Sequence, residues 1–270
     1  LISRQLFALS RVEKPWLSQT LIRWYAKQFK VDVSQALETD LTRYPSLNAF
    51  FTRALKPEAR PVDPTENAFV SPADGVLSET GPIDKKSLIQ AKGSHYNLDE
   101  LLGGHTELAA PFIDGDFATV YLSPRDYHRL HMPCDATLTE MIYVPGRLFS
   151  VSLMTTRHIP RIFTRNERVV CLFDTPHGRL GLVLVGAINV AAIETVWAGL
   201  ITPPQKKTVT LTRYDEPTAF KCGAEMGRFN MGSTIVVLTE KDAVFWADTA
   251  RPGTSVNMGQ KLGTAACGDS

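Results

Sequence analysis

The chain has 270 residues, 44% of them hydrophobic and 21% charged, which is enough apolar chain to bury a core and excludes a disordered, collagen-like or coiled-coil protein. The formal net charge of +1 gives no electrostatic reason to expect a nucleic-acid partner. No apolar run approaches the roughly 18–20 residues that span a bilayer. The basic start is not followed by the uninterrupted apolar region of a secretory signal. The four cysteines stand far apart without a CxxC pair, so we expect neither a disulfide framework nor a zinc knuckle.

Positive charge is concentrated at the start of the chain, where the first 30 residues carry a net charge of +5 and leave −4 for the rest. Leu17, Leu21, Trp24 and Tyr25 recur at helical spacing, and Pro15 just before them suits the first turn of a helix. A basic amphipathic helix is typical of a segment that lies on an anionic membrane surface. It is equally typical of a terminal helix docked on its own domain, and the pattern alone leaves both interpretations open.

The rest of the chain divides into a helical front and a β-rich remainder. Helix-compatible sequence continues to about residue 51, and the proline-rich stretch that follows, with Pro57, Pro61 and Pro64, is interpreted as a connector. Short β-rich runs then alternate with turn residues, and helical periodicity is weak except near residues 98–102. The predicted strands cover residues 117–122, 169–173, 182–190, 208–212, 235–238 and 243–246. The sequence therefore predicts an α+β fold: N-terminal amphipathic helices in residues 1–56, then a mainly antiparallel β core in residues 57–270.

Two polar stretches contain residues that could carry chemistry. The first, SPADG at residues 71–75, ends in an Asp-Gly pair, which is most often only a turn. The second, RDYHRLHMPC at residues 125–134, places His128 and His131 three residues apart, with Cys134 at the same interval. Without an HExxH or paired CxxC motif we expect no metal site here. An acid or base role for a histidine is favoured because its pKa lies near neutrality, with a structural role as the alternative.

A third stretch, GRFNMGST at residues 227–234, runs into the predicted strand at residues 235–238. A Gly-Ser pair alone carries little information. Ile235 stands where the nucleophile elbow of α/β hydrolases requires glycine, so that motif is excluded. The occurrence of all three stretches in this order is more informative than any one of them.

Together these stretches resemble the phosphatidylserine decarboxylase family, the pyruvoyl-dependent proenzymes, in its bacterial form. The resemblance covers most of the chain and rests on residues 50–51, 71–75, 91–93, 121–134, 141–146, 165–168, 194–199 and the Gly-Ser-Thr segment. The family's cleavage motif is typically Leu-Gly-Ser-Thr, and Met231 here replaces leucine with a side chain of similar volume. Relatives often place a histidine directly after the glycine that corresponds to Gly93. In this chain the histidine, His95, comes two residues after that glycine, so His95 is assigned no role.

The resemblance implies that the chain cuts itself. Ser233 would attack the carbonyl of Gly232, with His131 as the base and Asp74 as the carboxylate that orients it. The ester would break by β-elimination and leave a covalent pyruvoyl group at residue 233 as the cofactor. A β chain of residues 1–232 and an α chain of residues 233–270 would remain associated as a heterodimer, with a higher oligomer left open.

The implied reaction converts phosphatidylserine to phosphatidylethanolamine and carbon dioxide, through a Schiff base between the pyruvoyl group and the substrate amine. His128 would contact the substrate carboxylate or deliver a proton, and residues 57–270 would form the catalytic domain. Because this anionic lipid stays in the bilayer, the resemblance favours peripheral attachment of residues 1–56 to the cytoplasmic side of the cell membrane. We expect no metal and no nucleic-acid partner.

Two other functions fit parts of the pattern. A serine hydrolase could use Asp74, His131 and Ser233 on an external ester, and it predicts an uncut chain. A non-catalytic β-sandwich module on a membrane would use the Gly-Ser turn only structurally. That module predicts that Ser233→Ala changes neither the fragment pattern nor lipid turnover.

Overall fold

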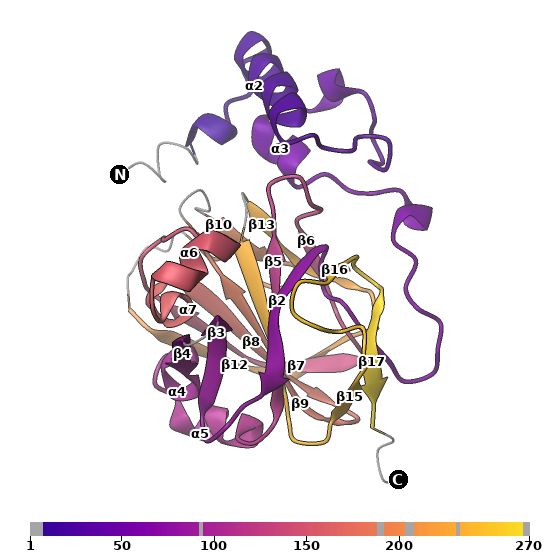
Figure 1. The fold of residues 1–270 in the computed structure, drawn as a ribbon. Helices are drawn as coiled ribbons and strands as arrows, with labels where there is room; N and C mark the ends of the chain where they lie inside the picture. Colours follow the sequence, from indigo (N-terminus) through magenta and orange to yellow (C-terminus); the bar gives the residue numbers. More distant parts are fainter. Residues whose placement is uncertain (1–7, 92–93, 188–191, 203–207, 231–232, 267–270) are drawn as a thin grey trace.

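The computed structural model describes residues 8–91, 94–187, 192–202, 208–230 and 233–266, and it confirms the predicted α+β fold (Figure 1). An eight-stranded antiparallel sheet forms its centre, in the order β12-β7-β8-β9-β14-β5-β2-β16. These strands are, in that order, Thr210–Phe220, Ala136–Val144, Arg168–Thr175, Gly178–Val185, Ser233–Thr239, Asp116–Leu122, Gly75–Pro82 and Ser255–Val256.

The central strands of this sheet are buried on both faces. Alternate side chains of a strand point to opposite faces, so an unbroken apolar run is what a strand between two cores requires. In β14, Ile235 and Val237 enter one core, whereas Val236 and Leu238 enter the other. The eight-stranded sheet is therefore the middle layer of the β-rich part.

Different elements cover the two faces. One face packs against a four-stranded sheet, β11-β10-β13-β6, and a three-stranded sheet, β1-β17-β15. Their strands are Gly199–Leu200, Ala192–Thr195, Glu225–Asn230 and Arg129–His131, and then Ala68–Val70, Lys261–Ala265 and Val244–Trp246. The other face packs against a hairpin and short helices. These are β3 (Ser87–Ala91), β4 (Ser94–Asn97), α4 (Leu98–Leu101), α5 (Thr106–Ala109), η3 (Ala110–Phe112), α6 (Leu153–His158) and α7 (Ile162–Arg165).

The N-terminal helices form a separate layer beyond one end of the sheet (Figure 1). They are α2 (Pro15–Gln28), η1 (Leu41–Arg43), α3 (Leu47–Phe51) and η2 (Pro57–Ala59). Helix α2 packs Tyr25 against Phe50 and Phe51 but leaves Trp16 72% and Trp24 55% exposed. One face of the helix is thus docked on the protein while another is uncovered. Among the described residues, no helix is long and apolar enough to cross a bilayer.

Several predicted boundaries were wrong. The helix-compatible stretch after α2 holds only η1 and α3, because Asp32 and Asp40 accept hydrogen bonds from nearby backbone N–H groups and form turns. The strand expected over residues 182–190 ends at Val185, and residues 188–190 lie outside the described residues. Strand β7 was not predicted, since polar residues interrupt the apolar pattern of its first half. The division at residue 56 stays a prediction, although the helical layer has its own apolar cluster.

Strand register defines one functional end of the eight-stranded sheet. Backbone pairing aligns Val144 with Arg168, Arg168 with Val185, and Val185 with Thr234. Ser233, the residue before Thr234, therefore lies at the end of the sheet where β7 finishes and β8 begins. The helical layer reaches the same end, because the Tyr25 hydroxyl donates to a backbone carbonyl in the loop that follows β5.

A buried arginine holds the connection from β7 to β8 against the sheet. The Arg168 guanidinium donates to four backbone carbonyls, those of Glu100, Leu101, Thr164 and Asn166. Burial lowers the pKa of Arg168 to about 10, so the group is charged at neutral pH. A single side chain thus joins α4 and α7 to the start of β8.

We expect Arg168→Met to destabilise the fold by at least about 3 kcal/mol, because it leaves these buried carbonyls without donors. The measurement is the midpoint of urea unfolding followed by tryptophan fluorescence. The exposed Arg147 provides the matched control, and Arg147→Met should change stability by no more than about 0.5 kcal/mol. Equal midpoints for the two variants would contradict this account of Arg168.

Candidate functional site

The three stretches singled out in the sequence meet in the structure. The backbone N–H of His131, in β6, donates to the carbonyl of Pro72 in the first stretch at 2.9 Å. Strand β13, which contains the start of the third stretch, pairs with β6, and the Phe229 N–H donates to the His128 carbonyl at 3.0 Å. Segments more than 50 residues apart in sequence therefore form one site.

The predicted cleavage site lies in the link between two sheets. Strand β13 ends at Asn230 in the four-stranded sheet, and Ser233 begins β14 in the eight-stranded sheet, where its backbone pairs with Leu122. Met231 and Gly232 lie outside the described residues, as does the side chain of Ser233. Both ends of the two-residue link are thus fixed by strand pairing. The Asn230 side chain also accepts a hydrogen bond from Asn48 of α3 at 2.8 Å.

The hydrogen bonds of His131 define which ring nitrogen can accept a proton. Its Nδ1 lies 2.8 Å from the Gly223 carbonyl, which only accepts, so Nδ1 carries the proton and Nε2 presents a lone pair. That Nε2 atom accepts from the Tyr127 hydroxyl at 3.0 Å. Burial lowers the pKa of His131 below its usual value. The ring is therefore neutral at pH 7 and able to act as a base at Nε2.

Asp74 is buried beside an arginine. Its carboxylate accepts from Arg60 through Nε at 2.8 Å and Nη2 at 2.5 Å, and from the Met258 N–H at 2.8 Å. Because the partners of both ring nitrogens of His131 are Gly223 and Tyr127, the described contacts do not join Asp74 to His131 directly. The orienting role of Asp74 stays a prediction.

The glycine after Asp74 has a packing reason of its own. A Cβ atom on Gly75 would lie 2.3 Å from the Tyr121 carbonyl oxygen, so only glycine fits where β2 begins beside β5. The Asp-Gly pair is thus more than a turn: glycine permits the close strand approach, and the aspartate supplies a buried charge.

His128 is fully buried and has an unused ring nitrogen. Its Nδ1 donates to the Asp126 carbonyl at 2.8 Å and its ring packs on Phe51, with 4.0 Å between centroids. Its Nε2 has no hydrogen-bond partner among the described residues. Burial lowers the pKa of His128 to about 3, so the ring is neutral. Among the described residues this buried nitrogen therefore has a lone pair that no donor occupies.

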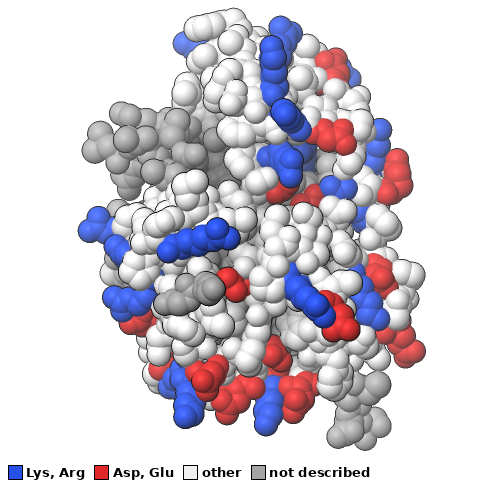
Figure 2. All heavy atoms as spheres, viewed as in Figure 1, with Lys and Arg blue, Asp and Glu red and all other residues white. Residues whose placement is uncertain are grey.

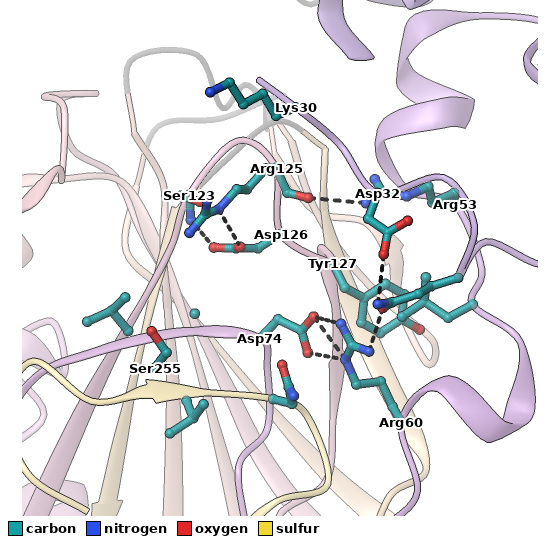
Figure 3. Close-up of a pocket in the computed structure, with 16 residues that line it drawn as sticks. Lys30, Asp32, Arg53, Arg60, Asp74, Ser123, Arg125, Asp126, Tyr127 and Ser255 are labelled. Carbon is teal, nitrogen blue, oxygen red and sulfur yellow. Dashed lines mark hydrogen bonds and ion pairs between the residues drawn. The ribbon is translucent and has the colours of Figure 1, made fainter. Parts of the chain in front are cut away.

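A pocket of about 380 Å³ lies between the helical layer and this end of the sheet (Figure 3). Its lining mixes both signs of charge: Lys30, Arg53, Arg60 and Arg125 with Asp32, Asp74 and Asp126. Figure 3 shows Arg60 turned toward Asp74, with Asp126 beside Ser123. Such a lining suits a ligand that carries negative and positive groups together.

Four pocket residues, Arg53, Arg60, Asp126 and Tyr127, were not identified from the sequence. Arg53 is only 4% exposed, and its Nε and Nη1 have no hydrogen-bond partner among the described residues. Asp126 accepts from the Ser123 N–H at 2.7 Å, and burial, followed by the charge of Asp74, raises its pKa. Arg53 precedes the proline-rich stretch that is interpreted from the sequence as a connector, and Arg60 lies within it. Asp126 and Tyr127 stand in the second stretch, where the histidines were the stronger signal.

The described part of the chain contains no group of three His, Cys, Asp or Glu side chains placed to share a metal ion.

Comparison with known proteins identifies similar sequences over nearly the whole chain. The profile of the phosphatidylserine decarboxylase family matches residues 47–264. A protein of Pseudomonas fluorescens Pf-5 is 54% identical over 267 residues, which cover 97% of this chain and 92% of that protein. A protein of Stutzerimonas stutzeri A1501 is 53% identical over 270 residues, with 98% and 91% covered. Both relatives are called phosphatidylserine decarboxylase proenzyme.

Burial of His128 should make the folded chain less stable in mild acid. Its pKa is about 3 in the folded state against about 6.5 unfolded, so the unfolded chain binds a proton first. The stabilisation is complete above pH 6.5 and is lost as the pH falls below that value. Between pH 7.5 and 5 we expect a loss of about 2 kcal/mol from this group. Urea unfolding at both pH values measures it, and His128→Gln should remove most of that loss; the same pH dependence in both proteins would contradict the assignment.

Proposed function

Because the chain belongs to the phosphatidylserine decarboxylase family, we propose that it removes the carboxyl group of phosphatidylserine as carbon dioxide and so produces phosphatidylethanolamine. The observation that carries this proposal is the position of two neutral histidines at the end of the sheet where Ser233 begins β14. A headgroup with a phosphate, a carboxylate and an ammonium group also suits the mixed charges of the adjacent pocket.

Maturation is proposed to begin with an attack of Ser233 Oγ on the Gly232 carbonyl carbon. The hydroxyl proton passes to His131 Nε2. The Tyr127 hydroxyl, which donates to that nitrogen in the structure, would relay the proton. The Ser233 amide nitrogen takes a proton as the peptide bond breaks, and an ester to Gly232 remains. Loss of the Cα proton of residue 233 together with the Gly232 carboxylate leaves dehydroalanine at residue 233. The dehydroalanine tautomerises to an imine, and water hydrolyses the imine to a ketone and ammonia.

Asp74 supports this step from a distance. Its charge raises the pKa of His131 slightly against the larger effect of burial, so it favours the protonated ring that forms when Ser233 loses its proton. Arg60 holds the carboxylate in place. Asp74 therefore acts through its electric field and its fixed position in this proposal.

The surroundings of residue 233 suit a small polar group. The hydroxyl oxygen of Ser123 is buried without a hydrogen-bond partner among the described residues, and Ser123 follows the residue that pairs with Ser233. A pyruvoyl group at residue 233 would supply a ketone that forms a Schiff base with the substrate amine and accepts the electron pair as carbon dioxide leaves.

His128 is proposed to move the proton of this second reaction. Since Nδ1 already donates to the Asp126 carbonyl, Nε2 presents a lone pair, which repels a carboxylate but accepts a proton. His128 Nε2 would relay a proton from the substrate ammonium group, which must be neutral to react, to the carbon that loses carbon dioxide. Of the two roles expected from the sequence, the geometry favours proton delivery.

After cleavage the two chains would remain one protein. The α chain, residues 233–270, would supply β14, which pairs with β9 on one side and β5 on the other. It would also supply β16, paired with β2, and β17, paired with β1. Backbone hydrogen bonds on several strands therefore support the proposed heterodimer.

Peripheral attachment to the cytoplasmic side of the membrane is proposed for the helical layer. The exposed Trp16, Arg23 and Lys27 lie on one side of α2, and Trp24 stands beside them. Exposed tryptophan next to basic side chains is suited to the interface of an anionic bilayer.

We expect purified protein to contain two chains, of residues 1–232 and 233–270, and Ser233→Ala to remain a single chain without activity. Intact-mass spectrometry measures both results and also reports the pyruvoyl terminus. Ser94→Ala in β4 is a matched control that should be cut normally. An active, uncut chain labelled at Ser233 by a serine-directed phosphonate would instead support a hydrolase, and an unchanged pattern in Ser233→Ala would support a binding module.

The two histidines should separate the two reactions. His131→Ala and Asp74→Asn should block cleavage, because the base and its supporting charge are lost. His128→Ala should be cut normally but decarboxylate at least about 100-fold more slowly, the usual contribution of a positioned acid or base. Gel electrophoresis and release of carbon dioxide measure the two steps. Normal processing of His131→Ala, or full turnover by His128→Ala, would remove that residue from its role.

A further inference from the structure

We propose that the segment between β7 and β8 is a second contact with the anionic bilayer, on a different flank of the site from α2. This β7–β8 segment, residues 145–167, contains α6 and α7. The proposal rests on the lipid substrate proposed above, but it concerns a surface that has no part in the reaction itself.

The segment carries a net positive charge. Residues 145–167 contain four arginines and one acidic residue, Glu167, which is buried. All four are exposed: Arg147, Arg157, Arg161 and Arg165. Arg147 and Arg157 have no ion-pair partner among the described residues, and Arg161 has only a half-exposed pair with Glu100 at 3.3 Å. Each basic residue near an anionic membrane surface contributes about 1 kcal/mol to binding.

An apolar tip accompanies this charge. Leu153 and Met154 begin α6 and are 36% and 75% exposed. One exposed apolar residue is ordinary, but two consecutive ones that lie between Arg147 and Arg157 in the sequence match the pattern of an interfacial helix. Methionine is flexible and adapts to an irregular surface such as the boundary between headgroups and acyl chains.

The position of the segment relative to Ser233 follows from strand register. The segment leaves the sheet at Val144 and returns at Arg168, and both residues align with the end at which Ser233 begins β14. Figure 1 shows α6 on one side of this end and α2 beyond it. In the same view, Figure 2 shows Lys and Arg side chains over and beside the region of α6 and along the region of α2. A bilayer that touches both would lie against the end of the sheet where the substrate must enter.

A bilayer fits this surface better than a second copy of the chain. In a symmetric dimer the same patch faces itself, so the arginines of the segment would meet each other without acidic partners. An anionic lipid surface supplies the missing negative charge. The exposed surface of the β7–β8 segment is therefore assigned to the membrane.

The test compares Arg147→Ala/Arg157→Ala and Met154→Ser with the unmodified full-length protein. Vesicles of phosphatidylcholine with 30% phosphatidylglycerol, an anionic lipid that is not the substrate, serve as the probe in a sedimentation assay. We expect about 30-fold weaker binding for the double variant, from two arginines at about 1 kcal/mol each. Met154→Ser should also weaken binding, whereas none of the proteins should bind pure phosphatidylcholine comparably.

Phe245→Ser/Arg251→Ala is the matched control. It removes the exposed Phe245 side chain of β15, a strand that lies far from α6 in Figure 1, and the exposed Arg251 side chain of the loop between β15 and β16, and it should bind as the unmodified protein does. Equal binding by the test and control variants would overturn the proposal. A smaller sedimenting species for the test variants without vesicles would overturn it too, since the surface would then join two copies of the chain.

Turnover distinguishes this proposal from the proposed function. With monomeric short-chain phosphatidylserine in solution, the test variants should decarboxylate as the unmodified protein does, and only turnover on vesicles should fall. Loss of activity on both substrates would overturn the assignment of the segment to the membrane. If the unmodified protein decarboxylates neither substrate, the proposed function fails. The vesicle-binding result would still show whether the β7–β8 segment contacts an anionic bilayer.

Discussion

The insertion of β14 between β9 and β5 is the constraint on which the site depends. Antiparallel pairing on both sides fixes the start of β14 at one end of the sheet, and the chain just before it belongs to a different sheet. The link from Asn230 to Ser233 must therefore cross between two rigid layers with only two residues. His128 and His131 come from the segment between β5 and β7, so the same sheet end carries the proposed nucleophile and both bases.

The electrostatics of this end keep both histidines uncharged. Burial is the largest effect on each, and it lowers the pKa of both rings. Each ring also donates through Nδ1 to a backbone carbonyl, which fixes the tautomer and leaves Nε2 as the reactive atom. Asp74 is ion-paired with Arg60, whereas Nε and Nη1 of the buried Arg53 have no hydrogen-bond partner among the described residues. A net positive contribution inside the pocket would favour an anionic headgroup.

Much of the architecture could be predicted because local pattern and tertiary environment agree. Helix α2 begins at Pro15 as the sequence indicated, and β14 was recognised because an unbroken apolar run suits a strand buried on both faces. Strand β7 was missed, since the first half of the strand carries polar residues that interrupt its apolar pattern. Trp24 was assigned to the apolar stripe of α2, yet it stays exposed while its neighbour Tyr25 is buried, because the docked face is narrower than the pattern indicated.

For the site, the sequence indicated which stretches matter but not how their side chains pair. Gly223 is distant in sequence from His131, and nothing local predicts that its carbonyl, rather than a carboxylate, contacts the ring. Likewise, Arg60 lies in a proline-rich stretch whose appearance as a connector concealed an ion pair with Asp74. Such pairings arise only when distant strands meet.

The central position of β14 also bears on how the folded state can be regained once it is lost. In the uncut precursor this strand is covalently tethered, so its insertion is an intramolecular event. A chain severed before Ser233 would have to recruit its own middle strand from solution, which makes reassembly second order in concentration. The persistence of the mature protein would then be set by how slowly it opens rather than by a reversible equilibrium. Cutting at this place would turn folding into a one-way process.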